Sequence, residues 1–300
     1  MRFLPASLVA ALVAVATGLP PAGCVEDQGP SGRPAPLFSA GGNGTPAPRG
    51  PGDLYRLQVL YLTERTGPGA EAVDFWRFLD ETVLPPSARS LLAANGLRMA
   101  VGGEMAREQL DRAVAANANV SVERAGDIFA YEGYALDVPH GAAQDDIALL
   151  YARRDGTVGG GDLGDASAIL RFQCLAAAQP DTTDVYVSEW ILHGRKQPRY
   201  RRTPTGWVEG QERPRFWFDD LKTTVPLREG QILVVGLEPG HPLSIGDHLF
   251  AARAEPYTVV TTIVLAPQLV APGAVPPGAR VVGQPDAGDA GTPGPSGANP

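Results

Sequence analysis

The sequence has only two cysteines, fewer basic than acidic residues, and no long apolar run beyond its N-terminal segment. Two cysteines among 300 residues cannot supply a disulfide framework. Lys and Arg number 25 against 33 Asp and Glu, and the net charge of −8 argues against a general nucleic-acid binder, which needs a basic footprint. Past the N-terminal segment, no stretch approaches the ~18 consecutive apolar residues of a membrane-spanning helix. We therefore expect no disulfide scaffold, no nucleic-acid partner and no internal membrane helix.

Glycine and proline are abundant instead, and they gather at the two ends of the chain. The sequence contains 36 Gly and 29 Pro. Residues 24–53 and 271–300 carry many of them without any apolar period, so we expect both segments to be disordered, the first as a tether and the second as a tail. The remaining chain of roughly 215 residues is long enough for one sizeable core or two small ones.

Residues 1–23 have the layout of an export signal. Arg2 supplies a positive charge, and residues 8–19 are almost wholly apolar but too short to span a bilayer as a mature helix. This pattern predicts a secretory signal peptide that is removed before the protein folds.

The end of this signal resembles the processing site of bacterial lipoproteins. Two small residues precede a cysteine in Ala22-Gly23-Cys24, although Pro21 stands where an aliphatic residue is usual. The resemblance implies cleavage before Cys24, a lipid on that residue, and a location in the bacterial cell envelope with the lipid in a membrane. Ordinary cleavage, for example after Ala16, remains the alternative and leaves Cys24 free.

The folded part of the chain predicts an α+β fold in two regions. Residues 54–119 have the pattern of a small β-α-α-β-α module, and residues 120–270 that of a mostly antiparallel β domain. In the module we expect strands at 54–62 and 97–101 and helices at 73–83, 87–95 and 104–117. In the β domain we expect strands at 134–138, 147–153, 168–176 and 185–192.

Residues 223–236 carry the clearest local pattern in the β domain. An apolar-rich strand runs into the turn Arg228-Glu229-Gly230, and a nearly all-aliphatic run leaves the turn and ends at Gly236. Two strands around a glycine turn predict a hairpin in the core, and a third strand at 257–265 would complete its sheet.

The sequence contains no recognisable motif for catalysis or metal binding. There is no Gly-x-Ser-x-Gly elbow, and the four histidines have no spacing that suits zinc. Residues 155–165 hold three aspartates among glycines, which favours a polar hairpin loop, with calcium as the alternative. Cys174 lies in an apolar strand pattern and is expected to be a small buried hydrophobe. We therefore expect a protein that is not an enzyme and has no cofactor or metal.

One basic cluster stands out against the acidic background. It consists of Arg195, Lys196, Arg199, Arg201 and Arg202. The alternatives are a solvated loop between strands and an anion-binding patch for lipid head groups or an anionic polymer, with Tyr200 and Trp207 as interfacial aromatics.

The C-terminal part of the folded region, about residues 184–270, resembles the end of the secretin domain. Secretins are the outer-membrane pore proteins of bacterial secretion systems. The matching features, in order, are Thr223-Thr224-Val225, the turn 228–231, the apolar run 232–235, Gly236-Leu237, Pro242-Leu243, Gly246, Leu249-Phe250, the run 258–265 and Pro267. One of that family's paired glycines is absent, and the chain is too short for its transmembrane gate strands. The resemblance implies at most an assembly element.

Together these observations predict an exported, lipid-anchored envelope protein with a non-catalytic binding or assembly role. Its expected partners are a membrane, reached through the lipid on Cys24, and an anionic polymer or another envelope protein. The alternatives are a secretin-like assembly subunit, and a secreted hydrolase or polysaccharide-binding module whose site the sequence does not reveal.

Overall fold

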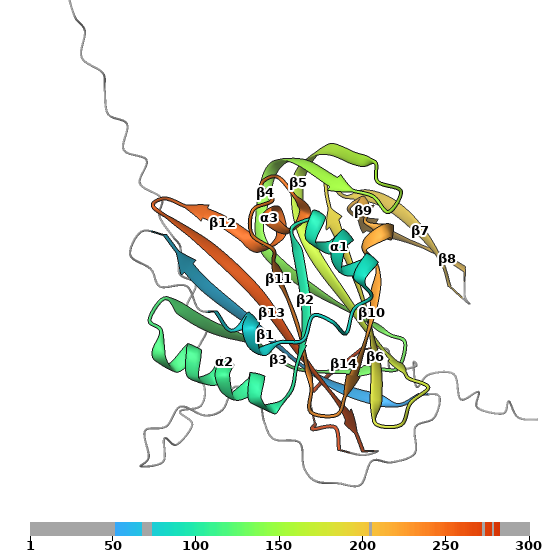
Figure 1. Ribbon diagram of the computed structural model, residues 1–300. Coiled ribbons are helices and arrows are strands. Elements are labelled where there is room, and N and C mark those ends of the chain that lie inside the picture. The colour runs from blue at the N-terminus through green and yellow to red at the C-terminus, as the bar shows by residue number, and fades with distance from the viewer. Residues whose placement is uncertain (1–51, 68–73, 204–205, 272–273, 278, 283–300) are drawn as a thin grey trace, which may run out of the picture. The chain divides into compact units, whose positions relative to one another are not determined.

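The computed structural model describes residues 52–67, 74–203, 206–271, 274–277 and 279–282 (Figure 1). The predicted signal peptide, Cys24, nearly all of the tether and most of the C-terminal tail lie outside these residues. Within the described residues, no helix is both long and apolar enough to cross a membrane.

Strands dominate the described part, and the helices are short. The strands are β1 (Leu54–Thr66), β2 (Leu97–Gly102), β3 (Val120–Tyr131), β4 (Ala135–Ala152), β5 (Val158–Ala176), β6 (Thr182–Leu192), β7 (Gln197–Thr203), β8 (Gly206–Glu212), β9 (Arg215–Trp217), β10 (Thr223–Arg228), β11 (Ile232–Leu237), β12 (Ala251–Ala254), β13 (Tyr257–Val270) and β14 (Arg280–Val282). The helices are η1 (Trp76–Phe78), α1 (Pro86–Ala94), α2 (Glu104–Ala116), η2 (Asp219–Leu221) and α3 (Ile245–Phe250).

The strands form two large sheets and a separate two-stranded ribbon. Sheet A has the order β14-β3-β1-β13-β11-β2, with β12 also paired to β13. Sheet B has the order β10-β6-β5-β4, with β9 also paired to β6. All of these pairings are antiparallel except that of β14 with β3. The ribbon, β7 with β8, joins neither sheet.

One core lies between the two sheets and a smaller one covers the far face of sheet A. In β13, Ile263 and Leu265 belong to the large core that also holds Phe172 and Val187 of sheet B. The alternate residue Val264 points into the second core, where Leu110 of α2 is also buried. Because β11 and β13 are covered on both faces, their sequences are continuous apolar runs without polar alternation.

The predicted separate module at 54–119 does not form a sheet of its own. Strands β1 and β2 do not pair with each other; β1 pairs with β13 and β3, and β2 pairs with β11. Long-range pairing therefore places this N-terminal region in the same sheet as the C-terminal strands. The predicted α+β content is broadly present, but strands outweigh helices, and β1 and β2 are parts of one larger sheet.

Several predicted elements have different limits in the structure. Residues 76–78 form a single 3₁₀ turn rather than part of a helix over 73–83. The predicted strands 134–138 and 147–153 are one strand, β4, with a register shift between His140 and Gln144. The glycine-rich segment expected as a loop begins β5 at Val158. In the predicted disordered tail, residues 280–282 form β14 beside β3.

The predicted hairpin at 223–236 is an arch that connects the two sheets. Strand β10 pairs with β6 in sheet B, whereas β11 pairs with β13 and β2 in sheet A. The expected pairing of β11 with the strand at 257–265 is present. The apolar pattern of two adjacent strands is compatible with a hairpin and with an arch, because both arrangements bury the same side chains.

Candidate functional site

The basic cluster lies partly on strand β7 of the ribbon and partly in the turn just before it, where Arg195 and Lys196 stand. Strand β7 pairs with β8 in a register that sets Arg199 opposite Gly210 and Tyr200 opposite Glu209. In Figure 1 the ribbon extends away from β6 and β9. Between residues 195 and 215 the sequence has seven Lys or Arg and two Glu, so this segment is strongly positive within an acidic protein.

The described basic side chains of the ribbon are open to solvent. Arg195, Lys196 and Arg199 are all exposed, and none forms an ion pair with another described residue. Arg201 and Arg202 lie on β7, and their side chains are outside the described part. The structure thus brings the predicted cluster onto one strand and its preceding turn.

Two exposed aromatic side chains accompany these charges. Tyr200 is 63% exposed and Trp207 is 69% exposed. Tyr200 is paired with Glu209, two residues from Trp207, so both aromatics lie on the same face of the ribbon. Residues of this kind are enriched where a protein meets a partner or a membrane interface.

The base of the ribbon is held to sheet B by Arg213, which follows β8. The Arg213 guanidinium donates to the Gly194 carbonyl at 3.0 Å and to the Ser167 hydroxyl at 2.9 Å. The Gly194 N–H in turn donates to the Gly164 carbonyl at 2.7 Å. Arg213 therefore fixes the ribbon, and the basic residues beyond it remain available.

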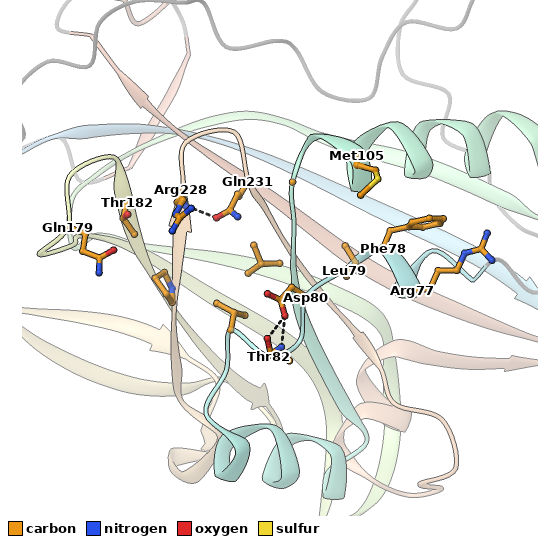
Figure 2. A pocket seen from close by; sticks show the side chains of 14 residues that line it. Arg77, Phe78, Leu79, Asp80, Thr82, Met105, Gln179, Thr182, Arg228 and Gln231 are labelled. Carbon is orange, nitrogen blue, oxygen red and sulfur yellow. Dashed lines mark hydrogen bonds between the residues drawn. The ribbon is translucent and has the colours of Figure 1, made fainter.

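A second candidate site is a pocket of about 720 Å³ beside the arch (Figure 2). Its walls come from the segment 77–83, from β2 and the start of α2, and from the β5–β6 and β10–β11 turns. Its apolar lining residues include Leu79, Val83, Val101 and Pro226. Sequence reasoning missed this site because its residues come from segments that only the tertiary fold brings together.

Polar groups on opposite sides of the pocket are held in place by local hydrogen bonds. The backbone of Asp80 exchanges hydrogen bonds with Val101 at 2.8 and 3.0 Å. Oδ1 of Asp80 accepts from the Thr82 N–H at 2.8 Å and from the Thr82 hydroxyl at 2.6 Å. These hydrogen bonds hold the pKa of the Asp80 carboxyl below its usual value, so the pocket carries a carboxylate at neutral pH.

The other side of the pocket is the turn of the arch. The Gln231 N–H donates to the Arg228 carbonyl at 3.0 Å, and the Arg228 N–H donates to the Gln231 side-chain oxygen at 2.7 Å. Gly230 has a φ of +82°, as the third position of such a turn requires. Figure 2 shows Arg228 and Gln231 beside each other, joined by the second of these hydrogen bonds.

The outer face of sheet B carries an arginine–tryptophan cluster that has a structural role. The Trp190 and Trp217 rings are stacked with centroids 4.9 Å apart. Arg171 and Arg215 lie 4.8 and 4.5 Å from the centre of the Trp190 ring. Arg171 also forms a paired hydrogen bond with Asp137 at 2.6 and 2.8 Å. These arginines are already engaged, and they cover Trp190, which is buried.

A glutamate and a histidine are buried beside the large core. Glu189 lies opposite Leu170 on the inner face of sheet B, and burial raises its pKa to about 8. His140 stacks on Phe250 with centroids 4.9 Å apart, and burial lowers its pKa to about 4. Neither lines the pocket. Strong pKa shifts can mark catalytic groups, but a substrate cannot reach side chains enclosed in this way.

The remaining candidates do not gather into a site. In the described ranges, no group of three or more His, Cys, Asp or Glu is placed to hold a metal ion. His248 contacts the Ala148 carbonyl at 2.9 Å through Nε2, and Asp247 accepts from the Leu243 N–H at 3.1 Å. Cys174 is buried in the large core as expected, and burial raises its pKa to about 12.

No protein-family model matches the chain, and no curated protein sequence matches it. Among solved structures, the chain is similar to the InvG secretin-domain β-barrel from the Salmonella SPI-1 injectisome. The identity is 12%, the TM-score is 0.23, and the match covers 75% of this chain and 65% of that one. The chain thus spans less than two thirds of that structure. This is a weak structural resemblance to a secretin domain, and a TM-score this low carries no argument about fold or function.

Proposed function

We propose that this is an exported, lipid-anchored protein of the bacterial envelope with a non-catalytic role, and that the β7–β8 ribbon binds a surface rich in phosphate groups. The observation that supports the ribbon is the exposed positive charge at Arg195, Lys196 and Arg199, which form no ion pair with the other described residues. The lipidation-like motif at Cys24 supports the anchor.

The ribbon has the physical properties that such binding needs. Each basic residue close to an anionic membrane surface contributes about 1 kcal/mol. An aromatic face with Tyr200 and Trp207 adds contact with the interfacial region, where such rings are favourable. Lipid head groups and anionic polymers share the same phosphate chemistry, so the experiment must separate them.

The experiment compares binding of the chain from residue 25 onward to three materials: vesicles of phosphatidylcholine, vesicles that also contain phosphatidylglycerol, and soluble polyphosphate. The test variant carries Arg195→Glu, Lys196→Glu and Arg199→Glu. Losing three favourable contacts removes about 3 kcal/mol, which is roughly a hundredfold in affinity. Binding of the unchanged protein should weaken as salt is added.

A matched control separates the position of the charges from the net charge. Arg65, Arg112 and Arg253 are exposed and lie outside the ribbon. Changing these three residues to Glu alters the net charge equally and should leave binding nearly unchanged. Equal losses in the two variants would show that binding reflects overall charge and would refute the ribbon as the site. Loss of vesicle binding with retained polyphosphate binding would exclude a single phosphate-binding surface.

The second candidate function is a secretin-like assembly subunit, which the order of motifs within residues 184–270 favours. Such a subunit is expected to form a ring at micromolar concentration. Size-exclusion chromatography with light scattering measures the molar mass directly, and a stable monomer would count against this candidate.

A further inference from the structure

The pocket beside the arch brings opposite charges together in a lining that mixes polar and apolar side chains. The Arg228 guanidinium lines it and has no carboxylate partner in the described part of the chain. Asp80 uses only Oδ1 for its bonds to Thr82, and its Oδ2 accepts no hydrogen bond from the other described residues. Arg77, the other arginine of the pocket, is held over the Phe78 ring at 4.7 Å. Among the described lining residues, Arg228 is the cation that comes from the arch, whereas Arg77 belongs to the same segment as Asp80.

The backbone that carries each of these two exposed side chains is fixed. Asp80 is bridged to the edge strand β2, and Arg228 stands at the start of a closed turn. The neighbouring Glu229 N–H donates to the Asp181 carbonyl at 3.1 Å, which ties the turn to sheet B. A ligand that spans the pocket does not have to order these segments, and this lowers the cost of binding.

The lining excludes a purely aliphatic ligand. Gln179 and Gln231 place amide groups among the apolar side chains of the lining, and the Thr182 hydroxyl donates to the Pro180 carbonyl at 3.4 Å. Gln231 uses its side-chain oxygen within the turn, so its NH₂ group is left to donate. An alkyl chain would cover these groups without pairing them, at a cost of about 1–3 kcal/mol for each one buried. A ligand with its own amide groups satisfies them.

We propose that this pocket binds short peptides that end in a free carboxylate. The carboxylate pairs with Arg228, a peptide N–H donates to Oδ2 of Asp80, and an apolar side chain rests on Val83 and Val101. The volume of about 720 Å³ lies within the range of ligand pockets and suits a few residues. This site lies apart from the ribbon and does not depend on the ribbon's function.

The test uses the chain from residue 25 onward and a library of tetrapeptides with free C-terminal carboxylates. The peptides retained by the immobilised protein are identified by mass spectrometry. The best of them is then measured by calorimetry as the acid and as its C-terminal amide. The acid should bind at least tenfold more tightly, because one charge-assisted bond to Arg228 is lost in the amide.

Variants then assign the contacts. Arg228→Gln should weaken the acid at least tenfold and leave the amide unchanged, because the amide makes no ion pair to lose. Asp80→Asn keeps an oxygen for Thr82 but removes the charge, and should weaken both forms. Arg112→Gln, on the exposed face of α2, should alter neither. Circular dichroism confirms that each variant is folded; if Arg228→Gln is not, Arg228→Lys replaces it and should weaken only the acid.

Three results would overturn the proposal. The first is that no peptide in the library is retained above the Arg228→Gln background. The second is that this variant weakens acid and amide equally, which would place the carboxylate elsewhere. The third is tighter binding of dodecanoate than of any peptide, which would assign the pocket to alkyl carboxylates. Because no ribbon residue is altered, these outcomes are independent of binding to phosphate surfaces.

Discussion

Glu189 should make the protein less stable as the pH rises through neutrality. Its side chain is on the inner face of β6, and both carboxyl oxygens lack a hydrogen-bond partner among the described residues. Burial raises its pKa from 4.5 to about 8. The folded protein therefore keeps this proton over a range in which the unfolded chain has lost it. Stability falls between those two values and levels off above the higher one.

His140 acts in the opposite direction over part of this range. Burial lowers its pKa from 6.5 to about 4, so the unfolded chain binds a proton that the folded protein excludes. Its contribution to stability is complete above pH 6.5 and is lost as the pH falls toward 4. Between pH 4.5 and 6.5 the two residues nearly cancel. Among the described side chains, the raised pKa of Glu189 then determines the slope between pH 6.5 and 8.

The magnitude follows from the pKa values. One pKa unit corresponds to 1.36 kcal/mol, so the unfolding free energy should fall by about 2 kcal/mol from pH 6.5 to 8 and by roughly 5 kcal/mol over the whole Glu189 range. Glu189→Gln removes the charge and should flatten the curve above pH 6.5. Its gain in stability near pH 8 should be smaller than the full effect, because the buried amide also lacks a partner.

The assay is urea unfolding followed by circular dichroism at several pH values between 5 and 9. The control is Glu229→Gln in the exposed turn of the arch, which should keep the slope of the unchanged protein. If the unchanged protein has a flat stability between pH 6.5 and 8, or if Glu189→Gln keeps the same slope, then Glu189 does not remain protonated in the folded core and the reasoning is wrong.

Three further predictions concern packing and processing. Gly246→Ala should destabilise the protein by about 3 kcal/mol or more in urea unfolding, because the new Cβ would lie 1.7 Å from the Gly96 carbonyl oxygen. The control Gly161→Ala should have little effect, because the space around Gly161 is open. Asn95→Ala should cost about 2–4 kcal/mol by the same assay, because the buried Asn95 amide bonds to backbone groups of both α1 and β4. Palmitate labelling in a bacterial host should be lost in Cys24→Ser; label that persists, or none in the unchanged protein, would exclude lipidation there.

Local chemistry made much of the secondary structure predictable. The apolar runs that became β11 and β13, the helix that became α2 and the burial of Cys174 all follow from residue patterns that few other structures satisfy. The basic cluster was also visible, because charge is a property of the sequence itself. The position of this cluster on an isolated ribbon was not predictable, because β7 and β8 contain few apolar residues and show no clear alternation of apolar and polar residues.

At some glycines, the tertiary contacts explain why the sequence has no side chain at that position. In the sequence, Gly236 marks the end of an apolar run. In the structure, a Cβ at this position would lie 2.9 Å from Cζ2 of Trp76, so the glycine lets that ring pack on sheet A. Gly96 follows a helix, as predicted, but its carbonyl also approaches Gly246 too closely for any side chain.

The sequence alone determined where strands, turns and charges occur along this chain, because these depend on neighbouring residues. The tertiary structure decided which strands pair, and the strand pairing in turn decided which residues line the pocket. Residues 223–237 illustrate the division: their pattern specifies two buried strands and a glycine turn, but a hairpin and an arch bury the same side chains equally well. Only the pairing of β10 with β6 and of β11 with β13 makes the turn a bridge, and places Arg228 across from Asp80.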